Sequence, residues 1–287
     1  MYRGILCLLI AEFCFALSTV FGKFVTTGSD ITGVELTFFR FLIGTVAVSA
    51  VMITTRISFR PVRTRYVVLR AILNTFAVLA FFTGIQYTTV TNANMLNLTY
   101  PVFVFCIAPF LNREKNHPAN YLYLCIALIG VYLIINPDFR SINPGDISAL
   151  LSGVIAGFGI SILRESRKYD SSEVILFYLM MIGCLISFFV MLPFFIMPRG
   201  MMLVHTLLSG GIAVAGQACI TFGYRYIGAA PGSVVSSSRM LFAVCMGVWF
   251  FADPLSIAII TGGVLLLIAL IGISGIVTIP RMKGDRR

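Results

Sequence analysis

Three charged residues lie deep inside long apolar runs of the sequence, namely Glu12, Arg40 and Arg239. If these runs cross a lipid bilayer, each buried charge costs about 2.5–3.5 kcal/mol on insertion scales and is expected to face the protein interior or a water-filled cavity. An isolated buried carboxylate favours its neutral form, so Glu12 is a candidate for exchanging a proton or binding an amine. A guanidinium binds carboxylate or phosphate through two hydrogen bonds, as Arg40 and Arg239 could both do.

These charges also have a structural interpretation. Glu12 could form an ion pair with an arginine of a neighbouring helix, and Arg40 could pair with Glu12 or Glu35 and fix the second helix. Arg239 follows three serines, and its mate in the internal repeat described below is the uncharged Tyr100. A charge added to one copy of a duplicated scaffold favours a role in substrate chemistry.

Other polar side chains occur within the same runs. Thr19 and Lys23 share a helical face with Glu12, because positions 12, 16, 19 and 23 recur at helical spacing. Amides and hydroxyls inside a membrane either join helices or line a pore. The remaining candidates for substrate binding or coupling are Asn74, Asn94, Asn97, Tyr100, Gln217 and Ser236. Gly153 and Gly157 form a small face that predicts close helix packing instead.

The composition indicates a polytopic membrane protein. The chain has 287 residues, of which 59% are apolar and 11% are charged, whereas a soluble domain has roughly 45–50% apolar and about 25% charged residues. The apolar residues form runs of about 20, the length of a helix that crosses a bilayer. Little sequence remains for a soluble domain. The first run resembles a signal peptide, but Glu12 interrupts it and no cleavage site follows, so we expect residues 1–25 to form a mature helix.

Hydropathy predicts an all-α integral membrane protein with ten transmembrane helices. Their approximate bounds are 4–25, 32–53, 66–86, 92–111, 119–136, 146–163, 172–196, 201–222, 231–251 and 255–278. Lys and Arg set the orientation, since sixteen lie in one set of alternate loops and termini and three in the other. The positive-inside rule then places both termini in the cytoplasm of a cell (inner) membrane. The net charge of +10 therefore does not indicate a nucleic-acid partner.

An internal repeat relates residues 84–114 to residues 223–253 at a constant offset. The two stretches share Gly84/Gly223, Tyr87/Tyr226, Phe103/Phe242 and Cys106/Cys245, and an acid closes each, Glu114 and Asp253. Ten helices divide into two five-helix repeats, residues 1–139 and 140–287. Since each repeat has an odd number of spans, the second is inverted in the membrane, and inverted repeats place a substrate site near the midplane between the halves.

The sequence gives little support for an enzyme. His117 and His205, its two histidines, lie at loops or span ends, and no hydrolase or phosphate-binding motif is present. The seven cysteines form no CxxC pair, so we expect neither a metal site nor a cofactor.

Several motifs resemble the drug/metabolite transporter superfamily, specifically its EamA-type ten-helix members. Phe15-Ala16 stands where that family has Trp-Gly, and Lys23 keeps its lysine. FFRFLIG with Arg40 matches the arginine of the second helix, and YPVFVFCIAPFLNRE matches the proline and closing glutamate of the fourth. Asp253-Pro254 is kept, but Arg239-Met240 replaces the family's acid and proline. The resemblance implies a secondary carrier with a central cavity that works by alternating access and exports amino acids or related metabolites.

The first hypothesis is therefore a secondary-active transporter of small metabolites, such as amino acids or related polar or zwitterionic compounds. Proton coupling would depend on Glu12. The alternative is a flippase for a lipid-linked substrate. We expect the lipid bilayer and a small-molecule substrate as partners, and either a monomer or a homodimer.

Overall fold

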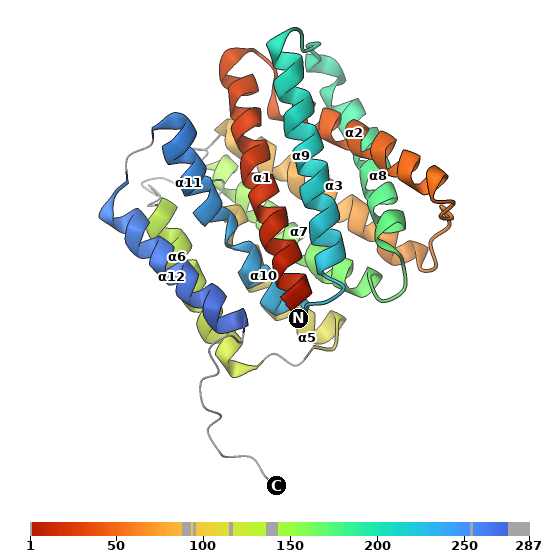
Figure 1. Cartoon of the computed structure of the whole chain (residues 1–287). Helices are drawn as coiled ribbons and strands as arrows, with labels where there is room; N and C mark the ends of the chain where they lie inside the picture. Colours follow the sequence, from red (N-terminus) through yellow and green to blue (C-terminus); the bar gives the residue numbers. More distant parts are fainter. Residues whose placement is uncertain are drawn as a thin grey trace.

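The computed structural model describes residues 2–87, 93, 96–114, 117–135, 143–252 and 255–274, and these residues form helices without strands. The helices are α1 (Tyr2–Gly28), α2 (Gly33–Thr54), α3 (Thr64–Tyr87), α5 (Tyr100–Leu111), α6 (Pro118–Ile135), α7 (Pro144–Ser166), α8 (Ser172–Met191), α9 (Met201–Gly223), α10 (Ala229–Ser236), α11 (Arg239–Phe251) and α12 (Ile257–Ser274). Figure 1 shows them as one bundle.

The helices account for the expected ten spans. Among the described residues, seven stretches are long and apolar enough to cross a membrane, and α10 and α11 together form one of them. Helices α5, α6 and α12 are shorter and apolar. A helix satisfies its own backbone hydrogen bonds, which is why an apolar chain in lipid adopts this form. The protein is thus an all-α, multi-pass membrane protein.

Short polar sequences fix where three of the helices begin. Thr32 caps α2 in a capping box with Glu35, and Asn143 caps α7 in the same way with Asp146. At α8 the side chain of Ser171 accepts a hydrogen bond from Val174 N–H. These side chains satisfy N–H groups that the first turn of a helix leaves free.

The packing of the helices shows the inverted repeat. The first helix of each half, α1 and α7, packs on the third helix of the other half, α9 and α3 respectively. The second helices, α2 and α8, pack on each other, and so do the fifth helices, α6 and α12. Figure 1 shows α1 beside α9, and the α6–α12 pair at the side of the bundle. Exchanging the two halves leaves this set of contacts unchanged, which identifies them as two inverted five-helix repeats.

Small residues make this reciprocal packing possible. In the α2–α8 contact, Met180 covers Gly44 and Phe41 covers Gly183, and in each helix the large residue precedes the glycine by one turn. In the α6–α12 contact, Gly130 and Gly262 bring the two backbones together, since a Cβ on Gly130 would lie 2.8 Å from the carbonyl oxygen of Gly262.

The fourth span of each half is not the continuous helix that the sequence predicts. A turn at Leu98 and Thr99 precedes α5, and a turn at Ser237 and Ser238 separates α10 from α11. At these turns a backbone N–H donates to the carbonyl three residues earlier instead of four, as Ser238 N–H does to Val235 at 3.0 Å. The helical segments that follow begin at the matched positions 100 and 239, so the repeat alignment is confirmed.

Candidate functional site

An ion pair between the two halves lies at the centre of the bundle. Arg239 Nε, in the first turn of α11, donates a 2.6 Å hydrogen bond to Oε2 of Glu12 on α1. Glu12 has no exposed surface, whereas about a third of the Arg239 side chain, 34%, is accessible. The second oxygen of Glu12, Oε1, has no hydrogen-bond partner among the described residues. A buried carboxylate with one free oxygen and an accessible guanidinium form a site that can exchange partners.

Arg40 contacts an aromatic ring that Arg239 also contacts. Its guanidinium carbon is 5.2 Å from the centre of the Phe15 ring, and that of Arg239 is 4.8 Å from it. Arg40 Nη2 donates to Oε1 of Gln217 on α9 at 3.1 Å. Arg40 therefore bonds to an amide of the other half, and two cations contact the Phe15 ring.

The predicted pairing of Arg40 with Glu12 or Glu35 is wrong. Glu12 bonds to Arg239, and Glu35 accepts hydrogen bonds from Thr32 N–H and from Ile196 N–H in the segment before α9. The capping box at the start of α2 occupies Glu35, because its side chain is placed by the helix start rather than by helix packing.

Two buried tyrosines complete the centre of the bundle. Tyr100, at the first position of α5, interacts electrostatically with Glu12 and Arg239. Tyr224, directly after α9, interacts with Tyr100 and Glu12, and Ser236 lies beside both phenol groups. The structure thus brings together Glu12, Arg40, Tyr100, Gln217, Ser236 and Arg239 of the predicted site residues.

Sequence reasoning missed Arg70 and Tyr224. Arg70 is one of the sixteen Lys and Arg residues that the sequence assigns to the cytoplasmic loops and termini, but it lies in the second turn of α3 with 3% of its surface exposed. Its charge acts on Arg40 and it interacts with Tyr224. The sequence did indicate that Arg70 lies within a span, because the predicted third span begins four residues before it. Tyr224 is fully buried, which no local pattern indicates.

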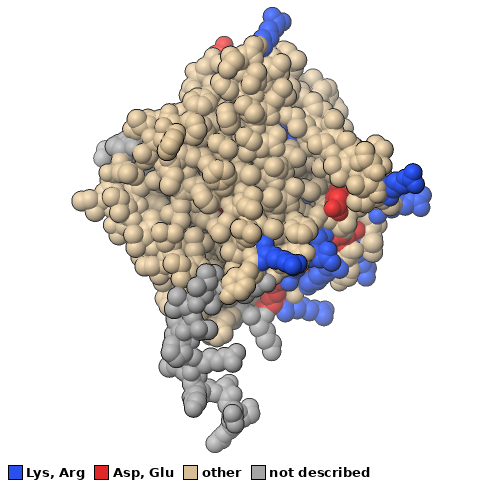
Figure 2. Space-filling view, viewed as in Figure 1, with Lys and Arg blue, Asp and Glu red and all other residues tan. Residues whose placement is uncertain are grey.

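One end of the bundle is basic, and hydrogen bonds join its loops to one another. It carries exposed cations of the α2–α3 loop and of the segments after α5, α7 and α9, including Arg60, Arg113, Lys168 and Arg225. Figure 2 shows most of the visible blue side chains gathered on one side. The carboxylate of Asp170 accepts the N–H groups of Val62 and Arg63 at 2.5 and 3.1 Å, which joins the α2–α3 loop to the segment after α7.

A further ion pair, between Glu114 and Arg164, joins the segments at this basic end. Arg164 Nε on α7 donates to Glu114 Oε1 at 3.0 Å, and Arg164 Nη1 donates to the carbonyl of Tyr224 at 2.9 Å. Glu114 Oε2 accepts the N–H of Ala229, the first residue of α10, at 2.8 Å. Glu114 of the first half therefore caps a helix of the second half, and Arg164 caps the C-terminal end of α9.

The comparisons with known proteins agree with this architecture. The model of the EamA-like transporter family matches residues 2–136 and 143–275, which is once in each half. The chain belongs to the EamA-like transporter family. It is a membrane protein of the drug/metabolite transporter superfamily, and its relatives transport small molecules.

Individual relatives are distant in sequence but match over most of their length. The chain is 23% identical to the pseudopaline exporter CntI of Pseudomonas aeruginosa, over 94% of this chain and 95% of that protein. It is 23% identical to human solute carrier family 35 member G1, over 86% of this chain and 72% of that protein. A crystal structure with a TM-score of 0.82 and 14% identity covers 95% of this chain and shows that the fold is a known one.

Several predicted site residues of this EamA-like chain lie apart from the central pair. Thr19 and Lys23 are exposed on α1, where Thr19 donates to the Phe15 carbonyl and Lys23 stacks on Phe251. Asn97 Nδ2 donates to Ser152 Oγ at 2.9 Å, and so joins its span to α7. These contacts are local or structural.

Asn74 and Asn94 are the two remaining predicted site residues. Asn74 Nδ2 is buried on α3 without a hydrogen-bond partner in the described part of the chain. Asn94 lies outside the described residues. The predicted packing role of Gly153 and Gly157 is confirmed, because a Cβ on Gly157 would lie 2.6 Å from Cβ of Phe103.

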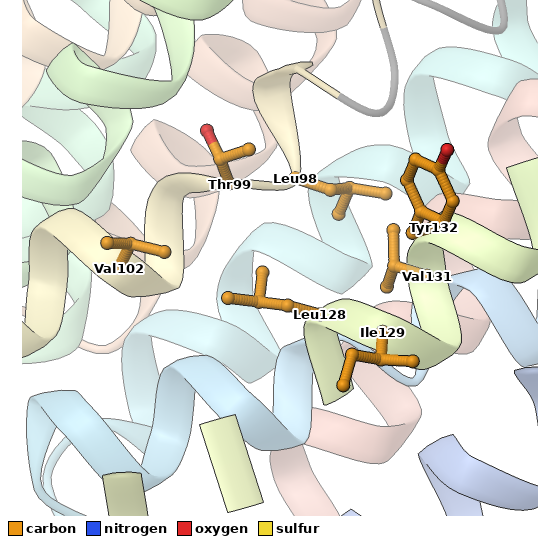
Figure 3. Close-up of a pocket in the computed structure, with 7 residues that line it drawn as sticks. All are labelled: Leu98, Thr99, Val102, Leu128, Ile129, Val131 and Tyr132. Atoms are coloured by element: carbon orange, nitrogen blue, oxygen red, sulfur yellow. The ribbon is translucent and has the colours of Figure 1, made fainter. Parts of the chain in front are cut away.

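An apolar hollow of about 320 Å³ lies away from these charges. Figure 3 shows it between the residues around the start of α5 and those of α6. Its lining comprises Leu98, Thr99, Val102, Leu128, Ile129, Val131 and Tyr132. None of the central polar residues lines it, so the polar site and the hollow are separate features.

Proposed function

We propose that this protein is a secondary-active carrier that exports small polar metabolites, such as amino acids or related zwitterionic compounds, by alternating access. The observation that carries the proposal is the Glu12–Arg239 pair, which joins the two inverted halves at a break in the ninth span. Broken helices at the interface of inverted repeats are where secondary transporters bind substrate.

The free groups of the pair suit a zwitterion. Glu12 Oε1 is a buried acceptor without a partner in the described residues, and it can receive an ammonium group. The accessible part of Arg239 can bind a carboxylate, while Arg40 and Gln217 offer further donors. A substrate that bonds to both members would separate the pair and so loosen the contact between the halves.

The two ends of the bundle differ in a way that supports alternating access. At the basic end, Glu114 and Arg164 bridge α5, α7, α9 and α10. Towards the other end, Thr19 and Lys23 on the Glu12 face of α1 are exposed. We infer that this state is closed at the basic end and that transport requires the Glu114–Arg164 pair to open.

Orientation and direction are part of the proposal. The positive-inside rule places the basic end and both termini in the cytoplasm of the inner membrane. Closure at that end would make the present state outward-facing. The similarity to the pseudopaline exporter supports export.

Proton coupling is proposed for Glu12. When Glu12 takes up a proton it loses its charge, and Arg239 is then released to hold an anionic group. One proton bound per cycle would let a proton gradient drive transport.

Transport by purified protein in proteoliposomes tests the proposal. Loaded vesicles should exchange labelled amino acids for external unlabelled ones, and Glu12→Gln should reduce this exchange at least tenfold. Glu173→Gln is the matched control, because Glu173 lies in the first turn of α8 outside the central site and should retain exchange. A panel of amino acids and organic anions that gives no protein-dependent flux would contradict a carrier of polar metabolites.

A flippase for a lipid-linked substrate is the second candidate, and the apolar hollow between α5 and α6 favours it. A lipid-linked substrate would seat its chain there and its headgroup at the central charges. It predicts that lipids carrying the headgroup compete for binding, whereas the free headgroup does not. The monomer and the homodimer both stay predictions, since either could carry one complete site per chain.

A further inference from the structure

We infer that the substrate carries two separate anionic groups, one held between Arg239 and Arg40 and the other by Arg70. This inference rests on the proposed carrier function and names the substrate class within it. Dicarboxylates and phosphorylated carboxylates share the required chemistry, because each presents two separate anionic groups.

The charges near the centre do not balance among the described residues. Arg40 and Arg239 both contact Phe15, Arg70 is buried with 3% of its surface exposed, and the carboxylate of Glu12 is bonded to Arg239. Within the described residues no carboxylate lies within 4.0 Å of Arg40 or Arg70. Among these residues Arg40, which is partly buried, and Arg70 therefore lack a counter-ion, and a membrane protein retains such charges where they act on a ligand.

Several donors near the centre are unused. The Nε–H groups of Arg40 and Arg70, the amide nitrogen Nε2 of Gln217 and the hydroxyl of Tyr224 are buried without hydrogen-bond partners in the described parts of the chain. Arg70 and Tyr224 are 3% and 0% exposed. Buried donors are normally satisfied, so a group of them around two cations indicates a missing acceptor.

The geometry divides these donors into two sets. Arg40 and Arg239 lie against one ring, that of Phe15, and Gln217 bonds to Arg40. Arg70 lies on α3 against α7, because a Cβ on Gly159 would lie 2.8 Å from its Nη1. A single carboxylate at Phe15 would leave Arg70 uncompensated, whereas a second anionic group would neutralise it.

Gly159 is the residue that permits this position of Arg70. Any larger side chain at 159 would meet the guanidinium, so Gly159→Ala should displace Arg70 without removing its charge. This gives a second variant that tests the position of the cation rather than its presence.

The experiment is a thermal-shift titration of the purified full-length protein in detergent. The probes are succinate, 3-phosphoglycerate, butyrate and glycerol, which separate two anionic groups from one and from none. We expect a dianion, meaning a probe with two anionic groups, to raise the melting temperature at a concentration at least tenfold below that of butyrate. A response to succinate alone would identify dicarboxylates, and a response to 3-phosphoglycerate alone would identify phosphorylated carboxylates.

Arg70→Met should remove the tenfold preference for the dianion and leave the butyrate response unchanged. Arg65→Met is the control, since Arg65 is an exposed cation in the first turn of the same helix. If Arg70→Met does not fold, Gly159→Ala must reduce the same preference.

Equal responses to butyrate and to both dianions would overturn the inference, as would a dianion preference that survives both variants. Flux assays keep this result separate from the proposed function. Exchange of a neutral amino acid without any response to dianions would refute the two-anion site but leave the carrier. An absence of flux for every compound would refute the carrier itself.

Discussion

Two helix contacts occupy equivalent places in the two halves. In one, α1 packs on α10 and α11, and in the other, α7 packs on the fourth span. Gly223 packs against the carbonyl oxygen of Gly4, and its repeat mate Gly84 packs against that of Gly145. Gly4 therefore matches Gly145, and the same offset aligns Glu12 with Gly153 and Ala16 with Gly157. In the α7 contact, Gly153 and Gly157 allow the backbones of the two helices to meet directly. In the α1 contact, Glu12 replaces the first glycine and Arg239 replaces Tyr100.

The difference shows where chemistry has been added to a duplicated scaffold. The uncharged contact is close-packed and can act as a fixed joint. The charged contact keeps a third of Arg239 accessible and leaves one oxygen of Glu12 unpaired among the described residues. We therefore expect the charged contact to bind substrate and the uncharged one to maintain the fold.

The largest effect is expected where the ion pair is broken on one side. Glu12→Gln should lower the free energy of unfolding by about 3 kcal/mol, because it leaves Arg239 without a counter-ion inside the protein. Arg239→Met in the same chain should recover most of this loss. Melting of the single and double variants in detergent measures the coupling, and additive effects would show that the two residues do not interact.

A second prediction tests the close-packed contact. Gly157→Ala should destabilise the protein by about 2 kcal/mol, since the new methyl group would meet Phe103 and the carbonyl of Tyr100. Gly211→Ala is the matched control in α9, because nothing lies within 4 Å of its added Cβ, and it should be neutral or slightly stabilising. Equal melting temperatures for the two variants would contradict this contact.

A third prediction uses the reciprocal α2–α8 packing. Gly183→Ala meets three ring atoms of Phe41 at 2.8 Å, whereas Gly44→Ala meets the flexible side chain of Met180. We expect a loss of about 1–2 kcal/mol for Gly183→Ala and a smaller loss for Gly44→Ala, because methionine adapts more readily than a ring. Chemical denaturation of both variants measures the order, and the reverse order would show that the pseudo-symmetric positions are packed differently.

The smallest effects are expected at the two ends of the bundle. Glu114→Gln should lower stability by about 1 kcal/mol, since it removes a partly exposed ion pair and weakens the cap of α10. Lys23 aligns with Arg164 in the repeat but is exposed over Phe251, so Lys23→Gln should change stability by less than about 0.5 kcal/mol. A larger loss for Lys23→Gln would indicate that the other end is also held closed.

Much of the fold followed from the sequence. Hydropathy predicted the ten spans, and the constant offset between residues 84–114 and 223–253 predicted the repeat that the packing shows. The boundary between residues 139 and 140 stays a prediction, as does the closing role of Asp253, which lies outside the described residues. The breaks before Tyr100 and Arg239 were missed, although Thr99 and Ser236–Ser238 are polar, because hydropathy averaged over a whole span does not register a turn of two residues.

The candidate site was predicted in part. Glu12, Arg40 and Arg239 stood out because charge is rare in an apolar run, and the structure brings them around Phe15. The partner of each charge was not predictable, since it depends on which helix faces which across the two halves. Arg70 was mistaken for a loop residue although it lies four residues inside its predicted span, and only its burial against α7 depends on the packing of the helices.

The sequence by itself determined that the chain is a helical membrane protein with duplicated halves and a few costly internal charges. These properties depend on composition, spacing and transfer energies, which act residue by residue along the chain. Only the tertiary structure decided that Glu12 bonds to Arg239 while Arg40 bonds to Gln217. Such pairings join residues far apart in the sequence, and the physical reason is that packing of the inverted halves, not local sequence, sets which side chains meet.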